Sequence, residues 1–248
     1  MKRSQPSLGA LPVPVAASLL GVLLLTPRSG GWAHSGHQLG LDQRDLRVLD
    51  NFLDPEANDN TTPHPSWPGA VGARLAVWKA AVEWGSALHG DGAGDPSQPG
   101  DLGSGGAGFD FTWQGSAPGP GGSTDNVVSA LSSCGGGVVA FTEAGPDGWR
   151  IRLCDDWLWD DGPGVTLAPG AFDIQGLLAH ELGHALGLAH SSVAGSTMSA
   201  TASGNGVTAR SLEADDRAGI QALYGAAGPT KPRIDLAFGD GTRVVLYG

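Results

Sequence analysis

The chain has 248 residues, of which 41 are glycine and 17 are proline, and only 16% are charged. This composition is typical of one loop-rich domain or two small ones and excludes a helical bundle, while 40% hydrophobic residues argue against disorder. The formal net charge of −11 would repel nucleic acid, and no lysine and arginine cluster offers a local exception, so we expect no nucleic-acid partner.

Residues 1–33 have the pattern of a secretory signal peptide. Lys2 and Arg3 give a positive start, residues 8–25 are apolar, and small residues at 31 and 33 allow cleavage after Ala33. The alternative is a membrane anchor, but two prolines and a short apolar core disfavour a spanning helix. We therefore expect a secreted protein, extracellular or periplasmic, with no stable membrane insertion after cleavage.

Residues 34–69 are polar, are broken by four prolines, and are interpreted as an N-terminal extension. Within them, Arg44–Phe52 alternates apolar and polar residues and predicts a first strand. The loop that follows gathers oxygen donors and is either a solvated turn or a calcium site; these donors are Asp50, Asp54, Glu56, Asp59 and Asn60.

The segment from 70 to 154 predicts a helix followed by four strands. Apolar residues recur at helical spacing over Ala70–Ala87. The Gly- and Asp-rich run at 89–108 is a surface excursion or a cation-binding loop. The strands are predicted at Phe109–Trp113, Asn126–Leu131, Gly137–Thr142 and Trp149–Cys154, with a turn at Gly145–Gly148 that joins the last two as a hairpin.

The only two cysteines, Cys134 and Cys154, flank this hairpin. In an exported protein an even pair favours a disulfide over two free thiols. Four aspartates then surround two tryptophans, in either a polar loop or a calcium site: Asp155, Asp156, Asp160 and Asp161. The sequence leaves both readings open, the polar loop and the loop that binds Ca²⁺.

Residues 180–190 read H-E-x-x-H-x-x-G-x-x-H, a pattern with chance odds below ~1 in 10⁴ at this composition. At 3.6 residues per turn, His180 and His184 share one helix face. Gly187 can take a positive φ, so the helix can end there and the chain can bring His190 back as a third ligand. Three neutral imidazoles leave one position of a tetrahedral Zn²⁺ for water, and Glu181 lies beside it. The alternative is an apolar helix whose histidines merely occupy its polar face.

This motif resembles the zinc-binding helix of the metzincins, and its flanks resemble the matrixin branch, which contains the matrix metalloproteinases and their bacterial relatives. Ser191 follows the third histidine as in matrixins, Ser196-Thr197-Met198 resembles the Met-turn beneath the zinc, and Leu212–Gly225 resembles the closing helix. Phe172–Gln175 resembles the start of the zinc helix in bacterial matrixins, and no cysteine precedes Cys134, so the resemblance is to the secreted, bacterial type.

The resemblance implies an α+β fold over residues 70–225. Its parts would be a twisted, mostly parallel five-stranded sheet with an antiparallel edge strand, a packing helix, the zinc-binding helix, and a C-terminal helix after the Met-turn. Asp215 and Asp216 would brace the Met-turn around Met198. Residues 226–248 predict a hairpin tail, either an added edge or the start of a surface module.

Together, the motif and the resemblance predict a secreted zinc endopeptidase. His180, His184 and His190 would hold the zinc, and Glu181 would act as general base on a zinc-activated water. A protein or peptide substrate would lie extended along the strand at 137–142, and we expect a monomer. The alternatives are a zinc hydrolase that acts on cell-wall peptide amides and a non-catalytic zinc-bearing surface module, against which the intact Glu181 argues.

Overall fold

The computed structural model describes residues 31–62, 69–85, 105–201 and 204–226, and the two strands at 233–237 and 243–247. Most of the predicted signal peptide and of the loop at 89–108 lies outside the described residues. In the part that is described, no helix has both the length and the apolar character needed to cross a bilayer.

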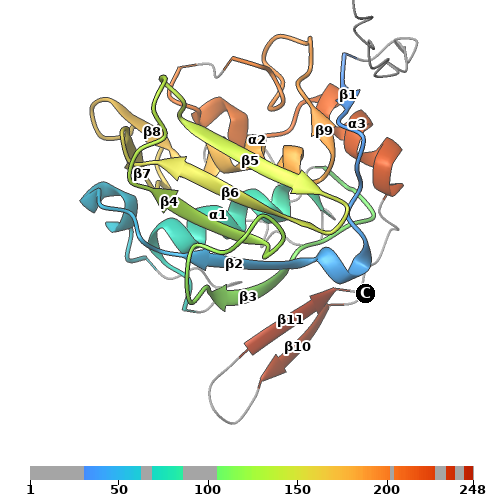
Figure 1. Cartoon of the computed structure of the whole chain (residues 1–248), viewed down its shortest axis with the longest axis horizontal. Helices are drawn as coiled ribbons and strands as arrows, with labels where there is room; N and C mark the ends of the chain where they lie inside the picture. Colours follow the sequence, from blue (N-terminus) through green and yellow to red (C-terminus); the bar gives the residue numbers. More distant parts are fainter. Residues whose placement is uncertain are drawn as a thin grey trace, which may run out of the picture.

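A five-stranded sheet forms the centre of the fold (Figure 1). In spatial order its strands are β3 (Thr112–Ser116), β2 (Asp45–Leu49), β4 (Val127–Leu131), β6 (Gly148–Cys154) and β5 (Ala140–Gly145). The first four run parallel, and β5 pairs antiparallel with β6 at the edge. The predicted mostly parallel sheet with an antiparallel edge strand is therefore confirmed. Because β2 lies between β3 and β4, the segment 34–69 contributes to the same fold as residues 70–225.

Two strands start later than their sequence patterns predict. The strand expected from Phe109 begins at Thr112, because the rings of Phe109 and Phe111 turn into the core and meet edge to face, with centroids 5.4 Å apart. The strand expected from Gly137 begins at Ala140, because residues 135–137 are glycines that all adopt positive φ. Such angles end regular strand geometry.

Two helices, α1 (Gly72–Trp84) and α2 (Ile174–Ala185), cover one face of the sheet and pack against each other (Figure 1). The alternate residues of the strands that face them are fully buried: Leu46, Val48, Val128, Ile151 and Leu153. The indole N–H of Trp84 donates to the carbonyl oxygen of Ala179 at 2.9 Å and so ties the helices together. Close packing at Gly183 requires glycine, since a Cβ there would overlap the sulfur of Met198 and lie 2.7 Å from the Trp84 ring.

Shorter elements complete the fold. They are the 3-10 turns η1 (Leu41–Gln43), η2 (Pro55–Asn58) and η4 (Val207–Arg210), the paired strands β1 (Ala33–His34) with β9 (Leu188–Ala189) and β7 (Leu158–Asp160) with β8 (Ala171–Asp173), and helix α3 (Ala214–Tyr224). The C-terminal residues form an antiparallel hairpin, β10 (Arg233–Ala237) and β11 (Arg243–Tyr247), with β11 close to the outer edge of β3 (Figure 1).

Candidate metal centre

Helix α2 is fixed at both ends, which sets the direction of its histidines. At its start the Asp173 carboxylate accepts from the amide of Gly176 at 2.6 Å and forms a fully buried ion pair with Arg210. This is the helix cap that the sequence predicts for an aspartate at this position. At its end Gly187 adopts φ +101°, where a side chain would overlap the carbonyl of His37. The chain can therefore leave the helix and return with His190.

Two of the three histidines have their tautomer set by backbone carbonyls. Nδ1 of His180 lies 2.7 Å from the carbonyl oxygen of Thr197, and Nδ1 of His184 lies 2.8 Å from that of Leu188. A carbonyl can only accept, so each Nδ1 carries the hydrogen and each Nε2 keeps its lone pair. Burial lowers the pKa of both imidazoles, which favours the neutral form that binds metals.

The three imidazoles converge on one point. Nε2 of His180 and Nε2 of His184 lie 3.1 Å apart, and one nitrogen from each of His180, His184 and His190 lies within 4.8 Å of the others. Two lone pairs facing each other at this distance repel unless a cation lies between them. Two nitrogens each ~2.05 Å from a tetrahedral zinc ion would be about 3.3 Å apart. The donor set therefore fits zinc, and it is the only such group among the described residues.

The Met-turn lies beneath this centre, with Met198 only 1% exposed. Its backbone is held by Asp216, whose carboxylate accepts from the amides of Thr197 at 2.7 Å and Met198 at 3.0 Å. The expectation that Asp215 also braces the turn differs from the structure: Asp215 accepts from the hydroxyl of Ser191 at 2.6 Å and from the amide of Trp32 at 3.2 Å. One aspartate thus holds the turn, and its neighbour fixes the chain just after His190.

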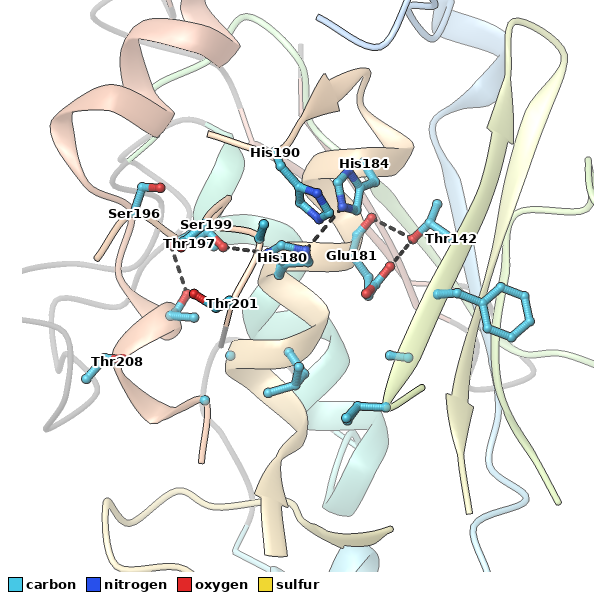
Figure 2. Close-up of a pocket in the computed structure, with 18 of the residues that line it drawn as sticks. Thr142, His180, Glu181, His184, His190, Ser196, Thr197, Ser199, Thr201 and Thr208 are labelled. Carbon is cyan, nitrogen blue, oxygen red and sulfur yellow. Dashed lines mark hydrogen bonds between the residues drawn. The ribbon is translucent and has the colours of Figure 1, made fainter. Parts of the chain in front are cut away.

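Glu181 lines the same cleft as the histidines (Figure 2). This cleft is a cavity of about 450 Å³ between α2, β5 and the loop after His190. Its side chain is 5% exposed, and burial raises the pKa of the carboxyl. The hydroxyl of Thr142, 2.6 Å from Oε2, opposes that shift and so favours the charged form. The sequence patterns did not single out Thr142, because a contact across 39 residues leaves no local signal.

The other predicted site residues serve local structure. Cys134 and Cys154 form a disulfide. Asp156 accepts from the amide of Cys134, Asp160 from the amides of Gly162 and Ala168, and Asp161 from the amide of Asn60. Three of the four aspartates of the proposed calcium site therefore face different partners, and calcium there stays a prediction.

The part of the chain that builds this centre is similar in sequence to known proteins. Residues 114–225 match the sequence profile of the family described as Matrixin. The chain is 44% identical to Matrilysin of Rattus norvegicus over 86 residues, which are 35% of this chain and 30% of that protein. It is 35% identical to Metalloendoproteinase 4-MMP of Arabidopsis thaliana over 100 residues (40% and 28%) and 49% identical to Stromelysin-3 of Xenopus laevis over 63 residues (24% and 12%).

The chain thus spans less than a third of the length of these relatives. Residues 114–225, which match the Matrixin profile, nevertheless contain the elements that build the metal centre, namely β5, α2, the Met-turn and α3. Over residues 114–225 the chain is therefore similar to the family described as Matrixin, and its three histidines form a group that could hold a metal ion.

Proposed function

We propose that the chain is a secreted zinc endopeptidase in which Glu181 is the general base. The observation that carries the proposal is the convergence of three imidazoles and one buried carboxylate on a single cleft. The match of residues 114–225 to the Matrixin profile supports it, as does the similarity to a plant protein named as a metalloendoproteinase.

The residues of the cleft divide the chemistry among them. His180, His184 and His190 would hold a zinc ion, which would act as a Lewis acid and lower the pKa of a water molecule. Glu181 accepts a proton from the attacking water and returns it to the departing amine, which requires a carboxylate that is charged at the start and protonated midway. The backbone carbonyls of Thr197 and Leu188 hold His180 and His184 in the orientation that leaves Nε2 free.

Strand β5 offers the substrate a backbone to pair with. Within the described sheet it is the terminal strand, hydrogen-bonded on one side to β6 alone. An extended peptide can therefore add to its open edge as a further strand, which gives affinity without reading sequence. Side chains of Val138, Val139 and Leu177 line the cleft beside it, so an apolar substrate side chain fits there.

The test compares Glu181→Gln with wild type on labelled casein, with zinc measured by elemental analysis. We expect one zinc per chain in both proteins and a kcat at least about 10²-fold lower in the variant, since general bases contribute about 10²–10⁴-fold. Glu56→Gln, an exposed glutamate on η2, is the matched control and should retain full activity. Unchanged casein cleavage by Glu181→Gln would reject Glu181 as the base.

The same assay on labelled cell wall, with and without a chelator, separates the alternatives. Chelator-sensitive release from cell wall but not from casein would assign a cell-wall hydrolase, and release from neither would assign a non-catalytic zinc module. Secretion, the bacterial type and a monomeric state are also proposals. They rest on the signal-peptide pattern of residues 1–33, on the start of the zinc helix at Phe172–Gln175, and on the family expectation.

A further inference from the structure

Thr142 is the residue of β5 that contacts the proposed base. Its hydroxyl lies 2.6 Å from Oε2 of Glu181 and 2.9 Å from the carbonyl oxygen of the same residue (Figure 2). Among the described residues no other group donates a hydrogen bond to this carboxylate. We infer that Thr142 is a positioning residue for Glu181, which holds one carboxylate oxygen and leaves the other for the reacting water. The inference rests on the proposed function.

The register of the edge hairpin explains why Thr142 reaches α2. Glu143 and Phe141 pair with Arg150 and Arg152, and Glu143 forms an ion pair with Arg150 on the outer face of the sheet. Side chains alternate along a strand, so Thr142 points to the opposite, inner face, toward α2. Its cross-strand neighbour Ile151 is fully buried. Thr142 itself is half-buried and lines the cleft, and its hydroxyl bonds Glu181 there.

The hydroxyl has one hydrogen and two acceptors, both on Glu181. When the carboxylate is charged, donation to Oε2 stabilises it, because charge-assisted hydrogen bonds are the stronger ones. When Glu181 carries the proton taken from water, the hydroxyl hydrogen can turn to the carbonyl oxygen 2.9 Å away. Thr142 can therefore serve both protonation states without moving its backbone.

The geometry also limits what Thr142 can do. Oε2 is engaged by the hydroxyl, whereas Oε1 has no hydrogen-bond donor among the described residues and remains available for proton transfer. A nearly isosteric Thr142→Val change would remove the donor but keep the β-branched shape that packs on the sheet. It would leave a buried carboxylate with no donor, free to rotate. Thr142→Ser would keep the hydroxyl and remove only a methyl group.

The experiment compares Thr142→Val and Thr142→Ser with wild type in the full chain. For Thr142→Val we expect kcat on a casein-derived peptide to fall about tenfold to a hundredfold, as for loss of a hydrogen bond to a charged group, while KM changes less than about twofold. Thr142→Ser should recover kcat to within about threefold of wild type. Zinc content should stay at one per chain, because both hydrogen bonds of the Thr142 hydroxyl go to Glu181 and neither goes to a histidine. Thr112→Val, the same change on β3 at the far edge of the sheet, is the matched control.

A second readout does not need activity. The infrared difference between the wild type and Glu181→Gln isolates the Glu181 carboxylate band, and the same difference in the Thr142→Val background should show that band shifted. Unchanged kcat in Thr142→Val, a Thr142→Ser as slow as Thr142→Val, loss of zinc, or an unshifted band would each overturn the inference. If the wild type cleaves no peptide, the proposed function fails, and the infrared comparison still decides whether Thr142 holds Glu181.

Discussion

Asp161 shows how one buried carboxyl can make stability depend on pH. It is 4% exposed, its Oδ1 has no hydrogen-bond partner, and its Oδ2 accepts from the amide of Asn60 at 3.1 Å. Burial, with the nearby carboxyls of Asp59 and Asp160, raises the pKa of Asp161 to about 7. The folded protein therefore binds a proton there more tightly than the unfolded chain, whose aspartates titrate near ~3.9.

The sign of the pH dependence follows from this difference. A carboxyl whose pKa is raised by folding contributes its stability below the unfolded pKa and loses it as pH rises toward about 7. In the zinc-free protein we expect the melting temperature of wild type to fall relative to that of Asp161→Asn between pH 5 and pH 8. The asparagine cannot ionise, so the variant should be the more stable protein at pH 8.

Asp156→Asn is the control for that measurement. In the wild type, hydrogen bonds from the amide of Cys134 and the hydroxyl of Ser133 lower the pKa of Asp156, so this carboxyl stays ionised over the tested range. This variant should show the same slope of melting temperature against pH as wild type between pH 5 and 8. An Asp161→Asn slope equal to that of wild type would mean that Asp161 is already ionised at pH 5.

At the scale of elements, the turn 154–157 holds the rim of the cleft in place. The amide of Cys154 donates to the carbonyl of Val139 at 2.9 Å, and the indole N–H of Trp157 donates to the carbonyl of Val138 at 2.8 Å. The disulfide joins Cys134 to the same turn. The two valines line the cleft, so this turn fixes the segment that leads into the substrate strand.

Trp157→Phe tests that role of the turn. The change removes the indole donor and keeps a ring against Phe172, with which Trp157 now makes an edge-to-face contact at 5.4 Å. We expect KM for peptide to rise about fivefold, the equivalent of one hydrogen bond of about 1 kcal/mol, with kcat within twofold. Trp113→Phe, on β3 at the other edge, should leave KM unchanged. A lower melting temperature with unchanged KM would assign Trp157 to stability alone.

How far the sequence predicts this molecule depends on the sequence separation of the contacts. The histidines of α2 are four residues apart and the cap Asp173 is adjacent to its helix, so local spacing predicts them. The hydrogen bond between Thr142 and Glu181 joins residues 39 apart in sequence, and that between Asp54 and Trp159 joins residues 105 apart. Contacts of this kind depend on strand order and register. Asp215 and Asp216 are neighbours in sequence, yet they face different segments, which only the packing of α3 decides.

At the scale of the whole molecule, the metal centre joins parts that are otherwise connected by loops. Helix α2 supplies His180 and His184, and the following segment supplies His190. The carbonyl of Thr197 bonds His180 while its amide bonds Asp216 of α3. An ion on the triad would therefore couple α2, the Met-turn and α3 into one unit. Since the imidazoles converge only in the folded chain, the binding energy of the ion adds to the stability of the fold.

We therefore expect zinc to raise the melting temperature. The size of this shift should distinguish variants that keep all three histidines from variants that lose one. At zinc about 1,000-fold above its Kd the gain is about 4 kcal/mol, which corresponds to about 10 °C for a domain of this size. Glu181→Gln should show the full shift, because Glu181 is not a ligand, whereas His190→Ala should lose most of it. A full shift in His190→Ala, measured by calorimetry with and without a chelator, would mean that the third imidazole does not bind the ion and that the centre is built from the helical pair alone.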